Sequence, residues 1–206
     1  VLELLETPEE DPMGNTMIPH NVKIKGCSTD GKVIYGAEYR SKGYGLIYWK
    51  DGVMYYPGKE EAQVKEVIYN SGSKIYSEKR PCTVGWHEDM NNGVAISPNG
   101  RYLAARFNDY EWIDEQTPSP EIYIPVCVDL ETGKVIKIDA GMPNAVGMAV
   151  DDEGHVFAKN IAKGDSNFNS CIVFNSIDYS AVSVSDFFKN QYGIELSDFR
   201  LIYQVG

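Results

Sequence analysis

Three segments of the chain repeat one pattern, which consists of a short apolar strand, a polar turn ending in Gly, and a second apolar strand. The segments span residues 24–36, 94–106 and 146–158, and their turns span 28–31, 97–100 and 151–154. Each turn begins with Ser or Asp, whose side chain bonds nearby backbone, and ends with Gly, which adopts positive φ without steric cost. Each segment is therefore predicted to form a β-hairpin.

A second predicted hairpin follows each of the first two. Residues 45–56 carry Asp51 and Gly52, a strong two-residue turn signal, and residues 123–138 turn at Gly133. Two hairpins in succession make a four-stranded antiparallel unit, which cannot bury both of its faces alone and stacks on similar units. We therefore predict an all-β, β-propeller-like array of four-stranded antiparallel blades. About three blades are clear, and they form either part of a ring or, with a fourth blade, a closed one.

We expect a single domain over residues 1–206, with blades at about 20–60, 92–140 and 144–182. The turn glycines Gly31, Gly100 and Gly154 are 69 and 54 residues apart, more than the roughly 40–50 of compact propeller repeats. Insertions at 61–91, with an extra hairpin over 64–76, and at 108–120 explain the excess, and both are expected to be exposed loops. Strand-like ends at 1–5 and 201–206 favour a part of a larger array.

The third unit departs from the pattern near its end. Residues 185–193 predict one short helix, with Ser185 as its N-cap and Gly193 as its C-terminal stop. Phe187, Phe188 and Tyr192 fall at helical spacing on this segment, which favours packing onto a sheet over a ligand site.

Composition excludes some classes of partner. Thirty acidic against 19 basic residues give a formal net charge of −11, which repels phosphate backbones, so nucleic acid is not expected as a partner. No apolar run reaches 18 residues, so no membrane insertion is expected. The chain begins at Val1 without a charged and then apolar leader, which favours a mature, processed or designed chain.

The cysteines leave two interpretations open. Cys27, Cys82, Cys127 and Cys171 include no C-x-x-C pair, which argues against a compact zinc site. They are either small buried side chains in strands or form one or two disulfides in an oxidising compartment.

The turn motifs resemble those of known propellers. Ser-Pro-Asn-Gly-Arg-Tyr-Leu-Ala-Ala at 97–105 resembles the repeated turn of bacterial extracytoplasmic propellers, including those of the Tol system and of prolyl-oligopeptidase-type enzymes. Ser-Thr-Asp-Gly-Lys-Val-Ile-Tyr-Gly at 28–36, followed by 48–52, is similar to the extracellular repeats called the HAF family. The resemblance covers about half the chain and implies a periplasmic, cell-surface or secreted bacterial protein. The Trp-Asp ending of WD-repeat propellers is absent.

Two loops carry candidate site residues. One holds Trp86, His87 and Glu88, followed by another carboxylate, which are side-chain types that ligate metals or move protons. A solvated polar loop is the alternative. The other loop mixes carboxylates and aromatics that suit a sugar ring or a basic peptide, with a solvated acidic insertion as the alternative. Its candidate residues are Asp109, Tyr110, Trp112 and Asp114.

Other motifs add no site. The acidic run at 151–153 is explained by turn chemistry, since the spaced oxygen pattern of a calcium loop is missing. Hydrolase, phosphate-loop and His-Glu-x-x-His motifs do not occur, so no cofactor, metal or catalytic residue is assigned.

We predict a noncatalytic module that binds a protein, peptide or glycan, and that self-associates or joins blades of a larger chain. One alternative is the propeller part of an enzyme, with a metal or acid/base site formed by His87 and carboxylates of Glu88, Asp109 or Asp114. Another is a structural spacer in a larger surface protein.

Overall fold

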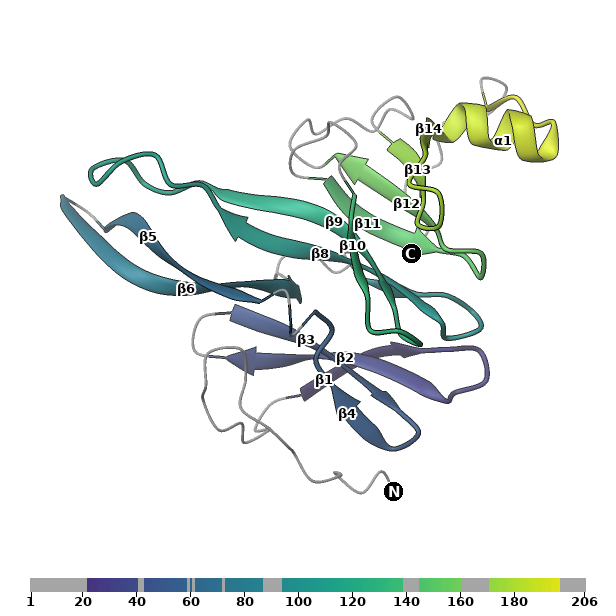
Figure 1. The fold of residues 1–206 in the computed structure, drawn as a ribbon, viewed down its shortest axis with the longest axis horizontal. Coiled ribbons are helices and arrows are strands. Elements are labelled where there is room, and N and C mark those ends of the chain that lie inside the picture. The colour runs from purple at the N-terminus through teal and green to yellow at the C-terminus, as the bar shows by residue number, and fades with distance from the viewer. Residues whose placement is uncertain are drawn as a thin grey trace.

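The protein is described by a computed structural model that covers residues 22–40, 43–58, 60, 62–71, 73–86, 94–138, 145–160 and 171–196. These residues form an all-β, propeller-like array of antiparallel strands with one short helix, as the repeats predict (Figure 1). Within the described part of the chain, no helix has the length and apolar character needed to cross a membrane.

The first four-stranded unit consists of β1 (Val22–Cys27), β2 (Val33–Arg40), β3 (Gly43–Lys50) and β4 (Val53–Tyr55), each antiparallel to the next. The turn between β3 and β4 places Asp51 at φ 51° and Gly52 at φ 80°. Positive φ at both central residues is the backbone of a type I′ turn, whose twist matches that of the flanking strands. The Asp-Gly pair therefore forms the hairpin that the sequence predicts.

Two further units repeat this strand order. The second consists of β7 (Ala95–Ile96), β8 (Tyr102–Tyr110), β9 (Glu121–Asp129) and β10 (Val135–Lys137). The third consists of β11 (Ala145–Val150), β12 (His155–Asn160), β13 (Cys171–Asn175) and β14 (Ala181–Ser183). Each unit is thus a pair of hairpins laid side by side, which is the construction of a propeller blade.

The segment between the first two units is a long hairpin and not an exposed loop. It consists of β5 (Gln63–Ser71) and β6 (Lys74–Trp86), and β6 also pairs with β3 and β8, which joins the first two units into one ten-stranded sheet. In the insertion at 108–120, β8 extends through Tyr110, and residues 111–120 form the expected loop, most of which is exposed. In the insertion at 61–91, the extra hairpin expected over 64–76 is confirmed. The expectation that this insertion is exposed is wrong for its described part, since Val67, Ile68 and Val84 are buried. These apolar side chains stabilise strand pairing that a solvated loop would lack.

Two apolar cores lie between the three units. Leu103, Ala105 and Phe107 of β8 contribute to a core with the first unit, and Tyr102 and Ala104 contribute to a core with the third. Successive strand residues point to opposite faces, so β8 supplies both cores by simple alternation. The second unit is consequently covered on both faces, as the position of β8 to β10 in Figure 1 suggests.

The repeated turns also contact one another from unit to unit. The backbone N–H of Thr29 donates to the carbonyl of Pro98 at 2.8 Å, and the N–H of Asn99 donates to Asp152 Oδ1 at 2.7 Å. Pro98 has no N–H to donate, which explains why the second contact uses the next residue along the turn. The turns therefore form a chain of hydrogen bonds along one end of the array.

Helix α1 (Val184–Tyr192) follows β14 directly and confirms the predicted helix. Its N-cap is Ser183 and not Ser185, because the Ser183 hydroxyl accepts a hydrogen bond from the N–H of Asp186 at 3.0 Å. The ring of Phe187 lies 5.2 Å from the ring of His155 and 5.6 Å from that of Phe157, so the helix packs onto the third unit as expected. Gly193 ends the helix at φ 69°.

The cysteines described as free are Cys27, Cys82 and Cys127, so none of these three pairs with another. Cys82 and Cys127 are buried, and burial raises the pKa of each thiol to about 11. For these two residues, the interpretation as small buried side chains in strands is confirmed.

Candidate functional site

An arm projects from the array on one side. We use the name arm for the hairpin of β5 and β6 together with residues 109–121, which connect β8 to β9. Figure 1 shows both parts extending together beyond the rest of the molecule. They are joined by two hydrogen bonds, from the N–H of Ser119 to the carbonyl of Ile68 at 2.7 Å and from the N–H of Ile68 to Ser119 Oγ at 3.0 Å.

The base of the arm is held by polar and aromatic contacts. Lys65 of β5 forms an ion pair with Asp109 of β8 at 2.5 Å. The Arg80 guanidinium of β6 lies 5.8 Å from the ring centres of both Tyr69 and Tyr110, a distance at which the cation is attracted to the faces of the rings. Two of the predicted site residues, Asp109 and Tyr110, therefore hold the arm together.

The charge of Asp109 is stabilised within this network. Burial raises its pKa, but hydrogen bonds from the Lys65 ammonium, the Tyr110 N–H and the Cys82 thiol outweigh burial, so that the pKa is lowered overall. The carboxylate is ionised at neutral pH and bound to its neighbours. In this arrangement it is a structural anion and is not poised to accept a proton from a substrate.

Asp114 organises the loop of the arm. Its Oδ1 accepts hydrogen bonds from the N–H groups of Gln116 and Thr117, both at 2.7 Å, and its Oδ2 accepts one from the Thr117 hydroxyl at 2.7 Å. The Thr117 hydroxyl and these N–H groups lower the pKa of Asp114. The loop is closed at its base by the N–H of Glu111, which donates to the carbonyl of Pro120 at 3.0 Å.

The arm carries large apolar side chains in solvent. Trp112 is 51% exposed and Ile113 is 52% exposed in the loop, while Ile75 and Tyr76 of β6 are 49% and 40% exposed. Single exposed apolar residues are ordinary, but several on one projecting element are typical of an interaction surface. Trp112 is the only one of the four that the sequence patterns single out.

The other predicted site residues, Trp86, His87 and Glu88, lie at the end of β6 and directly after it in the sequence. The backbone of Trp86 pairs with Tyr44 at the end of β6, and its side chain is not among those described. His87 and Glu88 lie outside the described residues. The predicted convergence of His87 with carboxylates of another blade therefore stays a prediction.

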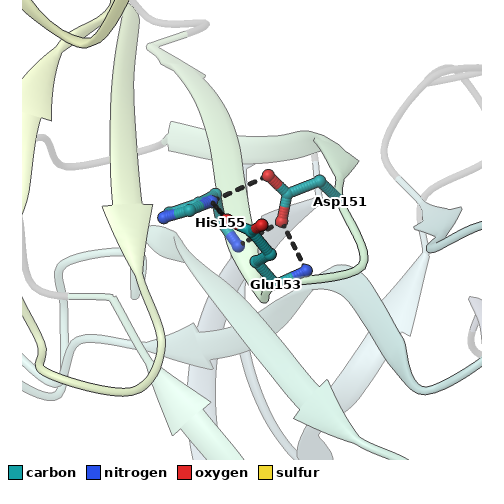
Figure 2. Close-up of side chains that lie close together, drawn as sticks. All are labelled: Asp151, Glu153 and His155. Atoms are coloured by element: carbon teal, nitrogen blue, oxygen red, sulfur yellow. Dashed lines mark hydrogen bonds and ion pairs between the residues drawn. The ribbon is translucent and has the colours of Figure 1, made fainter. Parts of the chain in front are cut away.

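A second cluster lies in the turn between β11 and β12, where Asp151, Glu153 and His155 approach one another (Figure 2). His155 Nδ1 lies 2.7 Å from Asp151 Oδ2 and 3.7 Å from Glu153 Oε2. Asp151 Oδ1 accepts the N–H groups of Glu153 at 3.0 Å and of His155 at 2.8 Å. The turn chemistry predicted for 151–153 is confirmed, but sequence reasoning missed His155.

A signal for this cluster is present in the sequence. In the other two turns the residue after the glycine is a cation, Lys32 or Arg101, whereas in the third it is His155. Because the turn reverses the chain, its first and fifth residues face each other across the hairpin. Asp and His at these two positions therefore predict a side-chain contact.

Known proteins resemble this chain only weakly. No family model and no curated protein matches the chain. Among solved structures, a crystal structure of TolB from Acinetobacter baumannii matches with a TM-score of 0.42 and 10% identity. The match covers 80% of this chain and 32% of that chain, so this chain spans about a third of the length of TolB. The propeller-like class rests on the strand order and the two cores between the units.

Proposed function

We propose that the chain is a noncatalytic propeller module that binds a protein, peptide or glycan through its arm. The observation that carries the proposal is the loop of Trp112 and Ile113, whose side chains are about half exposed while hydrogen bonds at Glu111, Asp114 and Ser119 hold the loop on either side of them. An aromatic side chain held in place loses little further freedom on binding, which favours affinity. The same side chain in a flexible loop would bind more weakly, because the loop would have to be ordered on binding.

The charge around Trp112 favours a ligand with cationic groups. Trp112 is flanked in the sequence by the acidic residues Glu111, Asp114 and Glu115, all of which are exposed. An indole stacks on a sugar ring or an apolar side chain, and nearby carboxylates attract Lys or Arg of the same partner. Among the three ligand classes, this combination fits a basic peptide or protein segment best, and a glycan is the second choice.

The test compares Trp112→Ala with Ile177→Ala, a control that removes an apolar side chain that is 67% exposed in the turn between β13 and β14. Both variants and the unchanged protein are titrated with Lys-rich and Leu-rich peptides and with soluble cell-wall oligosaccharides. We expect Trp112→Ala to weaken the binding of one probe class by about tenfold, as is usual for an aromatic anchor. Equal binding by all three proteins, or none by any, contradicts the proposal.

An enzymatic role at His87 is the alternative function. It requires His87 to meet a carboxylate from another element, and the two candidate carboxylates that the structure describes, Asp109 and Asp114, are already held by Lys65 and Thr117. His87→Ala with unchanged metal content and unchanged thermal stability would remove the metal version of this alternative.

We also propose that the module acts at the bacterial cell envelope, as one domain of blades at about 20–60, 92–140 and 144–182. The turn motifs at 28–36 and 97–105 support this location through their resemblance to exported propellers. The structure describes three units, and we propose that further blades or a second copy of the chain extend this array. Measuring the mass of the purified chain in solution by light scattering tests self-association, since a strictly monomeric mass rules out extension by a second copy.

A further inference from the structure

We propose that Asp151, Glu153 and His155 form a binding site for a divalent transition metal ion such as Zn²⁺. Each residue offers one ligand atom, and the three atoms lie within 4.8 Å of one another. Figure 2 shows the imidazole and the two carboxylates turned toward one another from the turn and the start of β12. One imidazole nitrogen with two carboxylate oxygens suits Zn²⁺ and its neighbours, whereas calcium prefers oxygen ligands alone.

Two of the three separations between ligand atoms can be compared with those around a bound ion. Around a tetrahedral zinc ion with bonds of about 2.0–2.2 Å, neighbouring ligand atoms lie roughly 3.3–3.5 Å apart. The separation of His155 Nδ1 and Glu153 Oε2 is 3.7 Å, and that of Nδ1 and Asp151 Oδ2 is 2.7 Å. Zinc binding replaces the hydrogen bond between Nδ1 and Asp151 Oδ2 by a bond from each of these atoms to the ion, and the neutral imidazole then carries its single proton on Nε2.

Two of the three ligands are already fixed. Asp151 Oδ1 is held by the N–H groups of Glu153 and His155, which leaves Oδ2 directed at the imidazole. The side chain of His155 is only 15% exposed, and Phe187 of α1 packs against its ring at 5.2 Å. Such supporting contacts orient metal ligands and strengthen binding.

The third ligand and the open positions face solvent. The side chain of Glu153 is 72% exposed and that of Asp151 is 36% exposed. Three protein ligands with a solvent-facing side leave room for water or for a donor atom of a bound partner, as in open zinc sites. The proposed site is therefore accessible to an ion from solution.

The other repeated turns act as internal controls for the pattern. Where the third turn has Asp151 and His155, the first has Ser28 and Lys32 and the second has Ser97 and Arg101. In the first turn, the Lys32 ammonium lies 3.2 Å from Asp30, which is an ordinary ion pair. The third turn differs from both at the two positions that supply Asp151 and His155.

The test is titration calorimetry of the full chain with ZnCl₂ in a buffer that does not bind zinc, after Cys27 is blocked by alkylation in every sample. We expect Glu153→Gln to weaken zinc binding by at least about tenfold. His155→Lys, which restores the cation of the other turns, should abolish binding at this site. Glu131→Gln is the control, since it makes the same change in charge at a different turn, where Glu131 pairs with Arg101 and not with a proposed ligand.

The outcome is decided by the comparison between variants. Loss of one zinc equivalent in His155→Lys, with Glu131→Gln like the unchanged protein, supports the site. The proposal is overturned if His155→Lys retains zinc binding in full. It is also overturned if the unchanged protein binds no zinc at concentrations of about 1 mM, which correspond to weak binding. Trp112→Ala is expected to bind zinc normally, so this proposal and the proposed function fail independently.

Discussion

At the scale of single residues, the turn glycines meet two different requirements. Gly133 and Gly154 both adopt positive φ, at 74° and 82°. A Cβ on Gly133 would meet no atom within 4 Å, whereas a Cβ on Gly154 would overlap Ser176 Oγ and approach the Tyr102 ring at 3.2 Å. Gly133 is thus required by backbone conformation alone, and Gly154 is required also by the close approach of Ser176 in its own unit and of Tyr102 in the second unit.

We therefore expect Gly133→Ala to lower the free energy of unfolding by about 1 kcal/mol, the usual cost of a left-handed conformation for a residue with Cβ. Gly154→Ala should cost about 3 kcal/mol, because overlap with Ser176 and crowding against Tyr102 are added to the backbone cost. Urea denaturation of the two variants measures both values. Equal losses would show that Gly154 is not closely packed against these two side chains.

At the scale of elements, the helix shows what local sequence can predict. The helix and its C-terminal Gly193 follow from local signals, and the correct N-cap was also within reach, since Ser183 and Asp186 have the spacing of a capping box. Ser183 Oγ indeed lies 2.7 Å from Asp186 Oδ2. The sequence offers Ser185 as well, and the choice between them depends on β14 ending at Ser183, which is fixed by pairing with β13.

The two serines provide a matched pair for experiment. Ser183→Ala removes the acceptor of the Asp186 N–H and should lower the free energy of unfolding by about 1 kcal/mol. Ser185→Ala lies within the first turn of α1 and should change it by less than about 0.5 kcal/mol. Thermal denaturation checks both variants, and a larger loss for Ser185→Ala would contradict the capping assignment.

Local sequence predicted a hairpin within the arm but not the contacts that hold the arm together. Those contacts join residues about 50 positions apart, such as Ile68 and Ser119. Pairing over such distances leaves no local periodicity to detect. The same reason kept Asp109 among the candidate site residues, because its partner Lys65 lies 44 positions away.

The ion pair of Lys65 and Asp109 gives the arm a pH dependence. The folded-state pKa of Asp109 is lowered, so its contribution to stability is present at neutral pH and is lost as pH falls below about 3.8 through the folded value. A double-mutant cycle with Lys65→Met and Asp109→Asn should give a coupling of about 0.5–1 kcal/mol at pH 7, because Lys65 is partly exposed. The coupling should weaken as the pH falls below about 3.8, and a coupling that acid does not weaken would show that the carboxylate charge is not involved.

At the scale of the whole molecule, the repeated turns were sufficient to predict the array. They recur because each unit needs the same reversal at the same end, and the structure joins these turns by hydrogen bonds from Thr29 to Pro98 and from Asn99 to Asp152. The function was less accessible, because exposed aromatic and acidic side chains carry little local signal and the cluster at His155 depends on the reversal of the chain. Both the arm and the cluster lie where the structure departs from the repeat.

The central claim is that the second unit is the middle layer, buried on both faces by its neighbours. Hydrogen exchange followed by mass spectrometry tests this claim directly across the chain. We expect the slowest exchange in peptides from β8 and β9 and the fastest in those from β4 and β14, which have exposed residues and pair along one edge. Exchange in β8 as fast as in β4 would contradict a central position for the second unit and with it the stacked array.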